Sequence, residues 1–257
     1  MPRSVSRPTL PIPTKGAAGT VDGVFDRSAR VYDAVYSFKD YAVEAARIAE
    51  EVRRRNPRAR SLLDVACGTG KHLEHLGAHF DVAGIDLDRD LLEIARARLP
   101  GVRLEQADMT SFDLDRSFDA VTCLFSAIGY ALTLDRMRAA VSTMSRHLEP
   151  GGVLIVEPWL APEAFEDGHI GTLIVDQPEL KVARFNTARR HGNVSELSFH
   201  YLIAEPGSGI EHATEEHRLG LFTSDEQRRA FEDAGLSVEH DPEGLIGRGL
   251  FVGTKKD

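Results

Sequence analysis

The sequence predicts an α/β fold in which a doubly wound parallel sheet carries helices on both of its faces. Apolar, strand-like runs alternate with helical patterns between residues 61 and 157, which is typical of a parallel sheet. A glycine-rich turn follows the first apolar run, and an acid ends the second. After residue 160 the pattern changes to two alternating runs, which indicates an antiparallel β insertion of about 60 residues after the fifth strand.

Local residue types set the predicted boundaries of these elements. Asp88 is a typical helix N-cap, and Pro100-Gly101 is a typical helix stop. Pro150-Gly151-Gly152 is expected to end a helix before an apolar strand, and His191-Gly192-Asn193 to join the two strands of a hairpin. The predicted helices are 25–55, 71–76, 88–99, 134–148 and 224–234, and the predicted strands are 61–65, 81–86, 102–106, 118–125, 153–157, 181–190, 194–204, 236–240 and 249–254.

The bulk composition fits one domain and excludes several classes of partner. The chain has 257 residues, of which 42% are hydrophobic, enough for one sizeable core. Its net charge of -9 argues against a nucleic-acid partner, because phosphate binding needs a basic surface. No apolar run approaches the roughly 18 residues of a membrane helix, so we expect no membrane partner. Cys67 and Cys123 show neither metal-ligand nor disulfide spacing, so we expect no metal and a reducing, cytoplasmic location.

The composition along the chain suggests its division. Residues 1–22 are rich in Pro, Ser, Gly and Thr and are expected to form a disordered leader. Residues 23–257 make up the predicted domain. Within it, residues 161–221 form the β insertion, which we expect to be a lid or a dimer interface.

The most informative stretch is Leu62-Leu63-Asp64-Val65-Ala66-Cys67-Gly68-Thr69-Gly70, with Asp86 at the end of the next apolar run. Glycines let the backbone approach a ligand, and a strand-end acid can accept from ribose hydroxyls, so the pattern predicts a nucleoside site. A dinucleotide site would need G-x-G-x-x-G, whose third glycine is missing. The D-x-x-x-G-x-G spacing resembles motif I of class I S-adenosylmethionine (SAM) methyltransferases, which have a Rossmann-like sheet.

The strand ends supply candidates for each part of SAM. Asp86 would accept hydrogen bonds from the ribose, and Asp108 and Met109 would border the adenine. The backbone of Gly68–Gly70 would face the amino acid tail, and Asp64 either shapes the turn or reaches the methionine amine. Each acid alone could equally be a turn or helix-cap residue. Three successive strand ends with suitable residues favour the site.

Methyl transfer needs no obligatory catalytic residue, because the sulfonium is already a good leaving group and alignment supplies most of the rate. Candidates for the acceptor side therefore come from position alone. Ser126 and Tyr130 follow the fourth strand, and Glu157 and Trp159 end the fifth. Tyr130 could orient an acceptor through its hydroxyl. Trp159 is either a pocket wall or a packing residue at the rim.

The predicted hairpin has one apolar and one polar face. Arg184 and Asn186 share a face of one strand, and His200 belongs to the polar face of the other. That polar face is either solvated or lines the acceptor pocket. Arg248, which has a glycine on each side, is either a surface charge or a binding residue for an anion such as a diphosphate. The residues expected on the apolar face are Leu197, Phe199, Tyr201 and Ile203.

Further segments extend the pattern beyond the glycine motif. They are Val31-Tyr32-Asp33, Lys39-Asp40-Tyr41, His72-Leu73-Glu74-His75, Leu148-Glu149-Pro150-Gly151-Gly152, Val156-Glu157-Pro158-Trp159 and Gly247-Arg248-Gly249-Leu250-Phe251-Val252-Gly253. With these segments the chain resembles, from about residue 31 to 253, the TDP-3-amino-sugar N,N-dimethyltransferases of desosamine and mycaminose biosynthesis. The resemblance implies a SAM-dependent enzyme that methylates the amine of a TDP-amino sugar twice, and a homodimer helped by the insertion.

The resemblance also implies roles for single residues. Tyr36 and Tyr41 would close over SAM and the acceptor, Arg248 would face the diphosphate, and Tyr130 would lie beside the sugar. Two positions depart from the family's pattern: Tyr130 stands where a histidine is common, and Leu160 where a second aromatic is common. Both would lie near the acceptor, so the sugar, the position of its amine (C3 or C4) and the number of methyl groups stay open.

The candidates fall into three groups. Tyr36 and Tyr130 are the expected catalytic residues. The expected cofactor-binding residues are Tyr36, Tyr41, Asp64, Ala66, Gly68, Gly70, Asp86, Leu87, Asp108 and Met109. The expected substrate-binding residues are Tyr36, Ser126, Tyr130, Glu157, Trp159, Arg184, His200 and Arg248. One alternative is a class I SAM methyltransferase that acts on a different small-molecule N or O acceptor, and another is a SAM-binding protein without catalysis.

Overall fold

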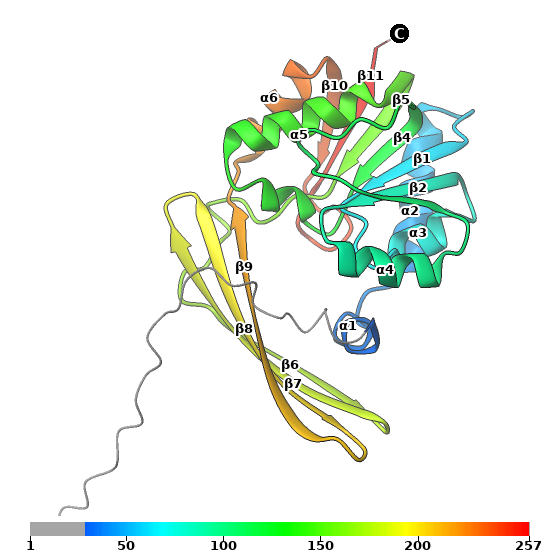
Figure 1. The fold of residues 1–257 in the computed structure, drawn as a ribbon. Coiled ribbons are helices and arrows are strands. Elements are labelled where there is room, and N and C mark those ends of the chain that lie inside the picture. The colour runs from blue at the N-terminus through cyan, green and yellow to red at the C-terminus, as the bar shows by residue number, and fades with distance from the viewer. Residues whose placement is uncertain (1–28, 257) are drawn as a thin grey trace, which may run out of the picture.

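Seven strands form the central sheet, in the order β10-β11-β5-β4-β1-β2-β3, and four form a second sheet, in the order β6-β7-β8-β9 (Figure 1). The computed structural model describes residues 29–256, and the leader expected at residues 1–22 lies outside them. The elements are α1 (Ala29–Val35), α2 (Tyr41–Arg55), β1 (Ser61–Val65), α3 (Lys71–Leu76), β2 (Asp81–Asp86), α4 (Arg89–Arg98), β3 (Arg103–Gln106), β4 (Phe118–Cys123), the 3-10 helix η2 (Ala127–Ala131), α5 (Leu134–Arg146), β5 (Leu148–Val156), β6 (Ile170–Gln177), β7 (Leu180–His191), β8 (Val194–Glu205), β9 (Gly209–Gly220), α6 (Ser224–Asp233), β10 (Leu236–Asp241) and β11 (Leu250–Lys255).

β1 lies at the centre of the larger sheet and pairs in parallel with both of its neighbours, β2 and β4. β3 and β5 extend the parallel arrangement on either side, and β11 runs antiparallel to β5 and β10. The carboxyl ends of β1 to β5 therefore meet at one edge of the sheet. The predicted α/β class and the position of the insertion after β5 are both confirmed.

Helices cover both faces of this sheet, as Figure 1 shows. On one face, Met137 and Val141 of α5 and Phe231 of α6 belong to the main hydrophobic core. On the other face, Ile48 and Val52 of α2 pack against the strands. Cap residues place the helix starts: Asp88 accepts hydrogen bonds from the backbone N–H groups of Asp90 and Leu91, as predicted, and Thr223 forms a capping box with Glu226.

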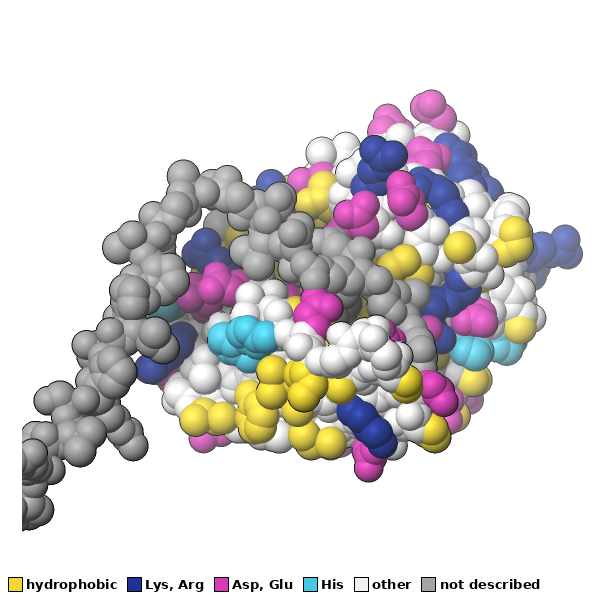
Figure 2. Space-filling model, turned by 60° about the horizontal axis from the view of Figure 1, so that its bottom comes forward, with side chains coloured by type: hydrophobic (Ala, Val, Ile, Leu, Met, Phe, Trp, Pro, Cys, Tyr) yellow, Lys and Arg dark blue, Asp and Glu magenta, His cyan; other side chains and the backbone are white. Residues whose placement is uncertain are grey.

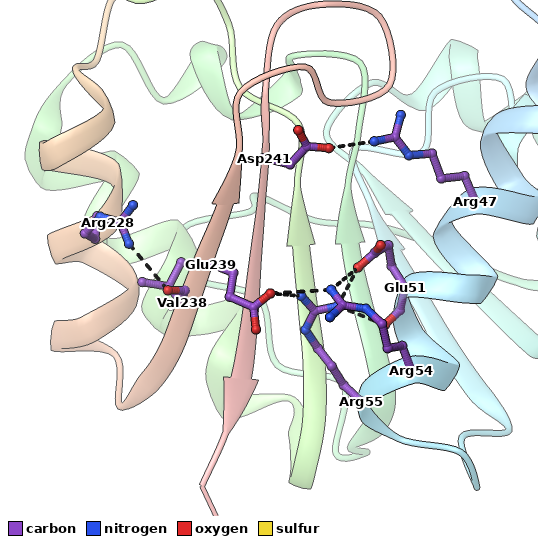
Figure 3. A network of polar contacts seen from close by, with 8 residues as sticks. All are labelled: Arg47, Glu51, Arg54, Arg55, Arg228, Val238, Glu239 and Asp241. Carbon is purple, nitrogen blue, oxygen red and sulfur yellow. Dashed lines mark hydrogen bonds and ion pairs between the residues drawn. The ribbon is translucent and has the colours of Figure 1, made fainter.

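Arginines at the C-terminal end of α2 form ion pairs with acidic residues, including one at the edge of the sheet. They do not form a separate basic surface for a ligand. Arg54 and Arg55 contact Glu51 and Glu239, and Arg47 pairs with Asp241 at 2.6 Å (Figure 3). These ion pairs link α2 to β10, the last strand of the sheet. Most of them are partly exposed, so each contributes modestly to stability.

The fifth strand begins earlier than predicted. α5 ends at Arg146 and β5 starts at Leu148, so the Pro150-Gly151-Gly152 segment lies inside the strand rather than before it. Phe118 pairs with Leu148 and Ala120 with Val153, which leaves residues 149–152 out of register as a bulge. The segment still breaks regular structure, but it does so within the strand.

The insertion has four strands, twice the predicted number. The predicted hairpin is present as β7 and β8, and β6 and β9 flank it as edge strands. β9 has the sequence GIEHATEEHRLG. Its many charged residues conceal the alternation of apolar and polar side chains that would indicate a strand. Charged side chains are common on edge strands, where they limit pairing with other chains.

Cross-strand register corrects the expected faces of the insertion. Arg184 lies directly opposite Tyr201, and Asn186 opposite Phe199. Because residues directly opposite each other share a face, Arg184 lies on the apolar face and not with His200. Helix α1 packs on this same face through Val31, Ala34 and Val35, next to Tyr201. We call it the inner face, since it turns toward the central sheet. Among residues 29–256, no helix has the length and apolar character to cross a bilayer.

Candidate active site

One cavity of about 610 Å³ lies between the carboxyl edge of the central sheet and the inner face of the insertion. The turns after β1, β2, β3 and β4 form one side of it. The tyrosines around α1 form a second side, and β7, β8 and β9 form a third. Its size is in the range of small-molecule sites. The predicted strand-end residues and parts of the insertion therefore border the same space.

In the turn after β1, every second residue from 66 to 70 has a left-handed backbone conformation. Ala66, Gly68 and Gly70 have φ angles of 59°, 55° and 77°. A Cβ on Gly68 would meet nothing within 4 Å, so its backbone is open to the cavity. A Cβ on Gly70 would lie 2.9 Å from Leu99 Cδ1, so this glycine allows α4 to pack closely instead. Only the first of the two glycines lines the cavity.

Asp86 lies at the end of β2 with only 8% of its surface exposed. Its Oδ2 accepts a hydrogen bond from Gly68 N at 2.7 Å, and its Oδ1 accepts from Asp88 N at 2.8 Å. Burial raises the pKa of this carboxyl group. A carboxylate has about four acceptor positions, so two stay available to a ligand in the cavity.

Asp64 is an almost fully buried acid at this edge, with 2% of its surface exposed. It accepts a hydrogen bond from Thr122 Oγ1 at 2.7 Å and lines the cavity from β1. Burial raises its pKa from 3.8 to about 7. Near neutral pH the group therefore exists partly as the neutral acid, and a cationic ligand group beside it would favour the charged form.

Asp108 and Met109 follow β3, and both line the cavity. Asp108 Oδ1 accepts from Thr110 N and Thr110 Oγ1, each at 2.8 Å. Asp108 Oδ2 pairs with Arg136 at 3.0 Å. Leu87, which is 64% exposed, borders the cavity next to Asp86. This end therefore combines apolar surface with a fixed carboxylate.

The tyrosines near α1 form an aromatic wall. Tyr36 lies 4.7 Å from Tyr32 and 5.2 Å from Phe125, measured between ring centroids. Burial raises the pKa of Tyr36 to about 12, so its hydroxyl stays protonated near neutral pH. Tyr41 packs edge-on against His72 at 4.9 Å.

The turn after β4 is strained and supported by β5. Phe125 and Ser126 both have left-handed backbones, with φ angles of 51° and 65°. Phe125 N donates to Glu157 Oε2 at 2.6 Å, and Ser126 Oγ donates to the Pro158 carbonyl at 2.9 Å. Two contacts from the residues that directly follow β5 thus hold an unfavourable backbone conformation at the cavity wall.

Arg248 extends across this turn into the cavity. Its Nη1 donates to Ser126 Oγ at 2.8 Å, and its guanidinium lies 4.8 Å from the Trp159 ring. Burial lowers the pKa of Arg248 below its ordinary value. Trp159 is itself fixed, because its Nε1 donates to Ser195 Oγ at 2.9 Å. Arg184 also lines this end, with its guanidinium 5.0 Å from the Phe199 ring.

Comparison with known proteins identifies the family of the chain. Residues 62–152 match a methyltransferase domain model. The chain is 48% identical over 229 residues, 88% of its length and 97% of the relative, to dTDP-3-amino-3,4,6-trideoxy-α-D-glucopyranose N,N-dimethyltransferase of Streptomyces venezuelae. The chain belongs to this family of amino-sugar N,N-dimethyltransferases.

Two further members show the breadth of the family. A dTDP-4-amino-2,3,4,6-tetradeoxy-D-glucose N,N-dimethyltransferase of Saccharopolyspora spinosa is 43% identical, over 88% of this chain and 92% of that one. The structure of SAM-bound CalS10, an amino pentose methyltransferase from Micromonospora echinaspora, is 44% identical and superposes with a TM-score of 0.82, over 88% of this chain and 97% of that one. The amino-sugar N,N-dimethyltransferases are SAM-dependent enzymes with the class I fold.

The cavity brings most of the predicted site residues of this N,N-dimethyltransferase together, but three predicted residues do not line it. Gly70 packs against α4, as described above. Glu157 is fully buried and reaches the cavity only through Phe125. His200 lies on the outer face of the insertion, where its Nδ1 is 3.2 Å from Nε2 of His212, so the structure does not place it near an acceptor. The predicted residues that line the cavity are Tyr36, Tyr41, Asp64, Ala66, Gly68, Asp86, Leu87, Asp108, Met109, Ser126, Tyr130, Trp159, Arg184 and Arg248.

A buried ionic cluster was missed by the sequence-based interpretation. Lys39 Nζ lies 2.8 Å from Glu44 Oε1, and His72 Nε2 lies 2.8 Å from Glu44 Oε2. The cluster links the segment before α2 to the first turn of α3, just behind Tyr41. Lys39-Asp40-Tyr41 and His72 occur in segments on which the resemblance to the family rests, but their spacing along the chain gave no reason to pair them.

Replacement of Asp64 by Asn is expected to stabilise the ligand-free protein at high pH. The raised pKa means that the folded state binds this proton more tightly than the unfolded state, so its contribution to stability is lost as pH rises from about 4 to 7. Asn carries no charge, so D64N should be more stable than the wild type by on the order of 2 kcal/mol at pH 8. Thermal unfolding at pH 4 and pH 8 measures this.

A matched substitution should have the opposite sign. The pKa of Asp119 is lowered, because hydrogen bonds from the backbone of Arg60 and Ser61 outweigh its partial burial. D119N should therefore lower the melting temperature at pH 8. An equal difference between D64N and the wild type at both pH values would contradict the assignment of the effect to ionisation of Asp64.

Proposed function

We propose that this chain transfers methyl groups from SAM to the amino group of a TDP-amino-deoxysugar, twice on the same nitrogen. The observation that carries the proposal is the continuity of the cavity. It runs from the strand-end carboxylates Asp86 and Asp108 to the guanidinium groups of Arg184 and Arg248. A nucleoside-containing donor and an anionic acceptor thus fit into one space. The names of the relatives supply the class of acceptor.

In this proposal SAM lies against the ends of β1, β2 and β3. Asp86 keeps two acceptor positions for the ribose hydroxyls, and Gly68 leaves its backbone open for the amino acid tail. Asp64 ionises when the methionine ammonium group comes close. SAM supplies the methyl group as a carbon bound to a positively charged sulfur. Tyr36 and Tyr41 cover the site and exclude water, which favours attack by the amine.

The acceptor lies between the turn after β4 and the inner face of the insertion. Arg248 binds the diphosphate, because a guanidinium already held by Ser126 and the Trp159 ring is fixed in position. Arg184 adds a second cation, and its buried Nε has no hydrogen-bond partner among the described residues. Tyr130 lines the same end and lies beside the sugar. Alignment of amine and methyl carbon supplies most of the rate.

We also propose the extent of the domain and the cellular compartment of the protein. Residues 23–257 act as one methyltransferase domain, which the coverage of 88% of the chain by full-length relatives supports. Cys67 and Cys123 are free, buried thiols, which supports a reducing compartment such as the cytoplasm.

The proposal predicts a two-step gain in mass. The protein with SAM should convert a TDP-amino-6-deoxysugar to its monomethylated and then its dimethylated form. Because relatives act on 3-amino and on 4-amino sugars, both isomers are assayed by mass spectrometry. Calorimetry with S-adenosylhomocysteine checks in parallel that the protein is folded and binds the cofactor product. No methylation of either isomer by protein that binds S-adenosylhomocysteine would contradict the proposal.

Loss of the Arg248 charge should weaken acceptor binding and spare SAM. R248M removes charge-assisted hydrogen bonds worth about 1.5–3 kcal/mol, which corresponds to a roughly 10- to 150-fold higher KM for the TDP-amino sugar. Steady-state kinetics measures the KM, and calorimetry should give an unchanged affinity for S-adenosylhomocysteine. Arg89 is exposed on α4, and R89M provides the control with unchanged kinetics. Equal losses for both ligands would show that Arg248 acts on the fold instead.

A homodimer formed through the outer face of the insertion is also part of the proposal. Five of the nine exposed large hydrophobic side chains among the described residues lie on this one face by register. Figure 2 shows hydrophobic side chains gathered beside histidines on the side turned toward the viewer. Such a patch on a soluble domain commonly marks an interface. The five residues are Ile170, Ile174, Phe185, Leu202 and Ile210.

A charge placed in this face should dissociate the dimer. Phe185 is 49% exposed in the middle of the patch, so F185D would bury an unpaired carboxylate at the interface. Light scattering after size exclusion should report a dimer for the wild type and a monomer for F185D. Val43 is 63% exposed on α2, away from the insertion, and V43D should stay a dimer. A monomeric wild type, or a dimeric F185D, would contradict this interface.

A further inference from the structure

Tyr130 makes a specific contact across the cavity. It lies in η2, after β4, and its hydroxyl is 2.8 Å from Nδ1 of His217 in β9. Both residues line the acceptor end of the cavity. The side chain of His217 is 21% exposed. The contact therefore connects the central sheet to the insertion at the place where an acceptor amine would lie.

The second nitrogen of the same imidazole faces a carboxylate. His217 Nε2 lies 3.4 Å from Glu215 Oε2, and Glu215 is only 4% exposed. Glu215 Oε2 also accepts a hydrogen bond from the Tyr201 hydroxyl at 3.0 Å. The edge of the Phe199 ring packs against His217 at 5.3 Å and limits its rotation. A carboxylate behind an imidazole orients the ring and stabilises its cationic form.

These contacts favour one tautomer of His217. Burial raises the pKa of Tyr130 above its ordinary value of 10, so its hydroxyl stays protonated and is able to donate to Nδ1 of His217. Nδ1 of His217 is then the acceptor, and Nε2–H points to Glu215. A neutral imidazole has one donor and one acceptor nitrogen, which matches both contacts.

We propose that Tyr130, His217 and Glu215 form a relay that removes the proton from the acceptor amine before each methyl transfer. The inference rests on the function proposed above. An aliphatic amine is mostly protonated near neutral pH, and an ammonium ion has no lone pair with which to attack carbon. The first transfer again produces an ammonium ion, so a double methylation needs this deprotonation twice.

The step balances in protons and electrons. The ammonium N–H proton moves to the Tyr130 oxygen while the Tyr130 O–H proton moves to Nδ1 of His217, so the phenol is restored and the imidazole becomes a cation. Glu215 stabilises that cation. The free amine then attacks the methyl carbon, the carbon–sulfur bond breaks, and sulfur keeps the electron pair. His217 releases its proton to water before the next round.

Other ionisable groups surround the relay. Glu215 interacts with Tyr201 of β8, and Tyr36 interacts with Glu215 and with the two arginines of the acceptor end, Arg184 and Arg248. Neither Tyr36 nor Tyr201 loses its proton near neutral pH, because burial raises the pKa of both. The imidazole of His217 is thus the group of this cluster that acts as the proton acceptor in the relay.

The pH dependence of variants tests the relay. H217Q should lower kcat about 100-fold at pH 7, at the lower end of the range for loss of general base catalysis. At pH 9.5 the amine arrives unprotonated, so the same variant should come within about threefold of the wild type. The KM for the TDP-amino sugar and the affinity for S-adenosylhomocysteine should change little. Y130F should show the same recovery at high pH, and E215Q a smaller loss at pH 7.

The controls distinguish failure of the relay from a structural effect of the substitution and from failure of the proposed function. His191 is exposed at the far end of β7, and H191Q should match the wild type at every pH. E215Q carries the test if H217Q does not fold. A loss in H217Q that is equal at pH 7 and pH 9.5, or no loss at pH 7, would overturn the relay. A wild-type enzyme that methylates no TDP-amino sugar would instead overturn the proposed function.

Discussion

The hydrogen bond from Phe125 N to the buried carboxylate of Glu157 is the contact on which the active site depends. It joins the ends of β4 and β5 and holds two successive residues in the left-handed backbone region. Phe125 then packs between Tyr36 and Lys39, and Ser126 accepts from Arg248. Burial raises the pKa of Glu157, so keeping it ionised costs free energy that the Phe125 N–H and the nearby cations Lys39 and Arg248 offset in part. One acid that does not line the cavity thus positions parts of both of its sides.

The cavity arises because two sheets with different constraints face each other. The parallel sheet brings successive strand ends to one edge, so Asp64, Asp86 and Asp108 come together although they are far apart in the chain. The insertion contributes an inner face of alternating apolar and polar residues, including Arg184 and His217. Helix α1 packs on that inner face and carries the tyrosines over the junction. The side of the cavity proposed for SAM is therefore built by the central sheet, and the side proposed for the acceptor by the elements around it.

The two ends of the cavity carry opposite charges. The chain has a net charge of -9, yet the acceptor end of the cavity holds the guanidinium groups of Arg184 and Arg248. The donor end holds three carboxylates, one of which titrates near neutral pH. This separation suits a cationic donor at one end and an anionic nucleotide at the other. Electrostatic attraction between these groups and such ligands is strong inside the cavity, because the surroundings there are less polar than water.

The sequence by itself determined the α/β class, the place of the insertion and the strand-end residues that line the cavity, because hydrophobic period and strand-end position are local properties. Fourteen of the predicted site residues line the cavity, and those at the strand ends, such as Asp64, Asp86 and Asp108, do so for that reason. Tertiary structure alone decided which face of the insertion turns inward, since this follows from cross-strand register: it placed Arg184 with Tyr201 and left His200 outside. It also revealed His217, because β9 is a charged edge strand whose partner defines its faces. Strand pairing brings residues that are distant in sequence into one site. The periodicity of a single strand does not reveal which strand it pairs with or in what register.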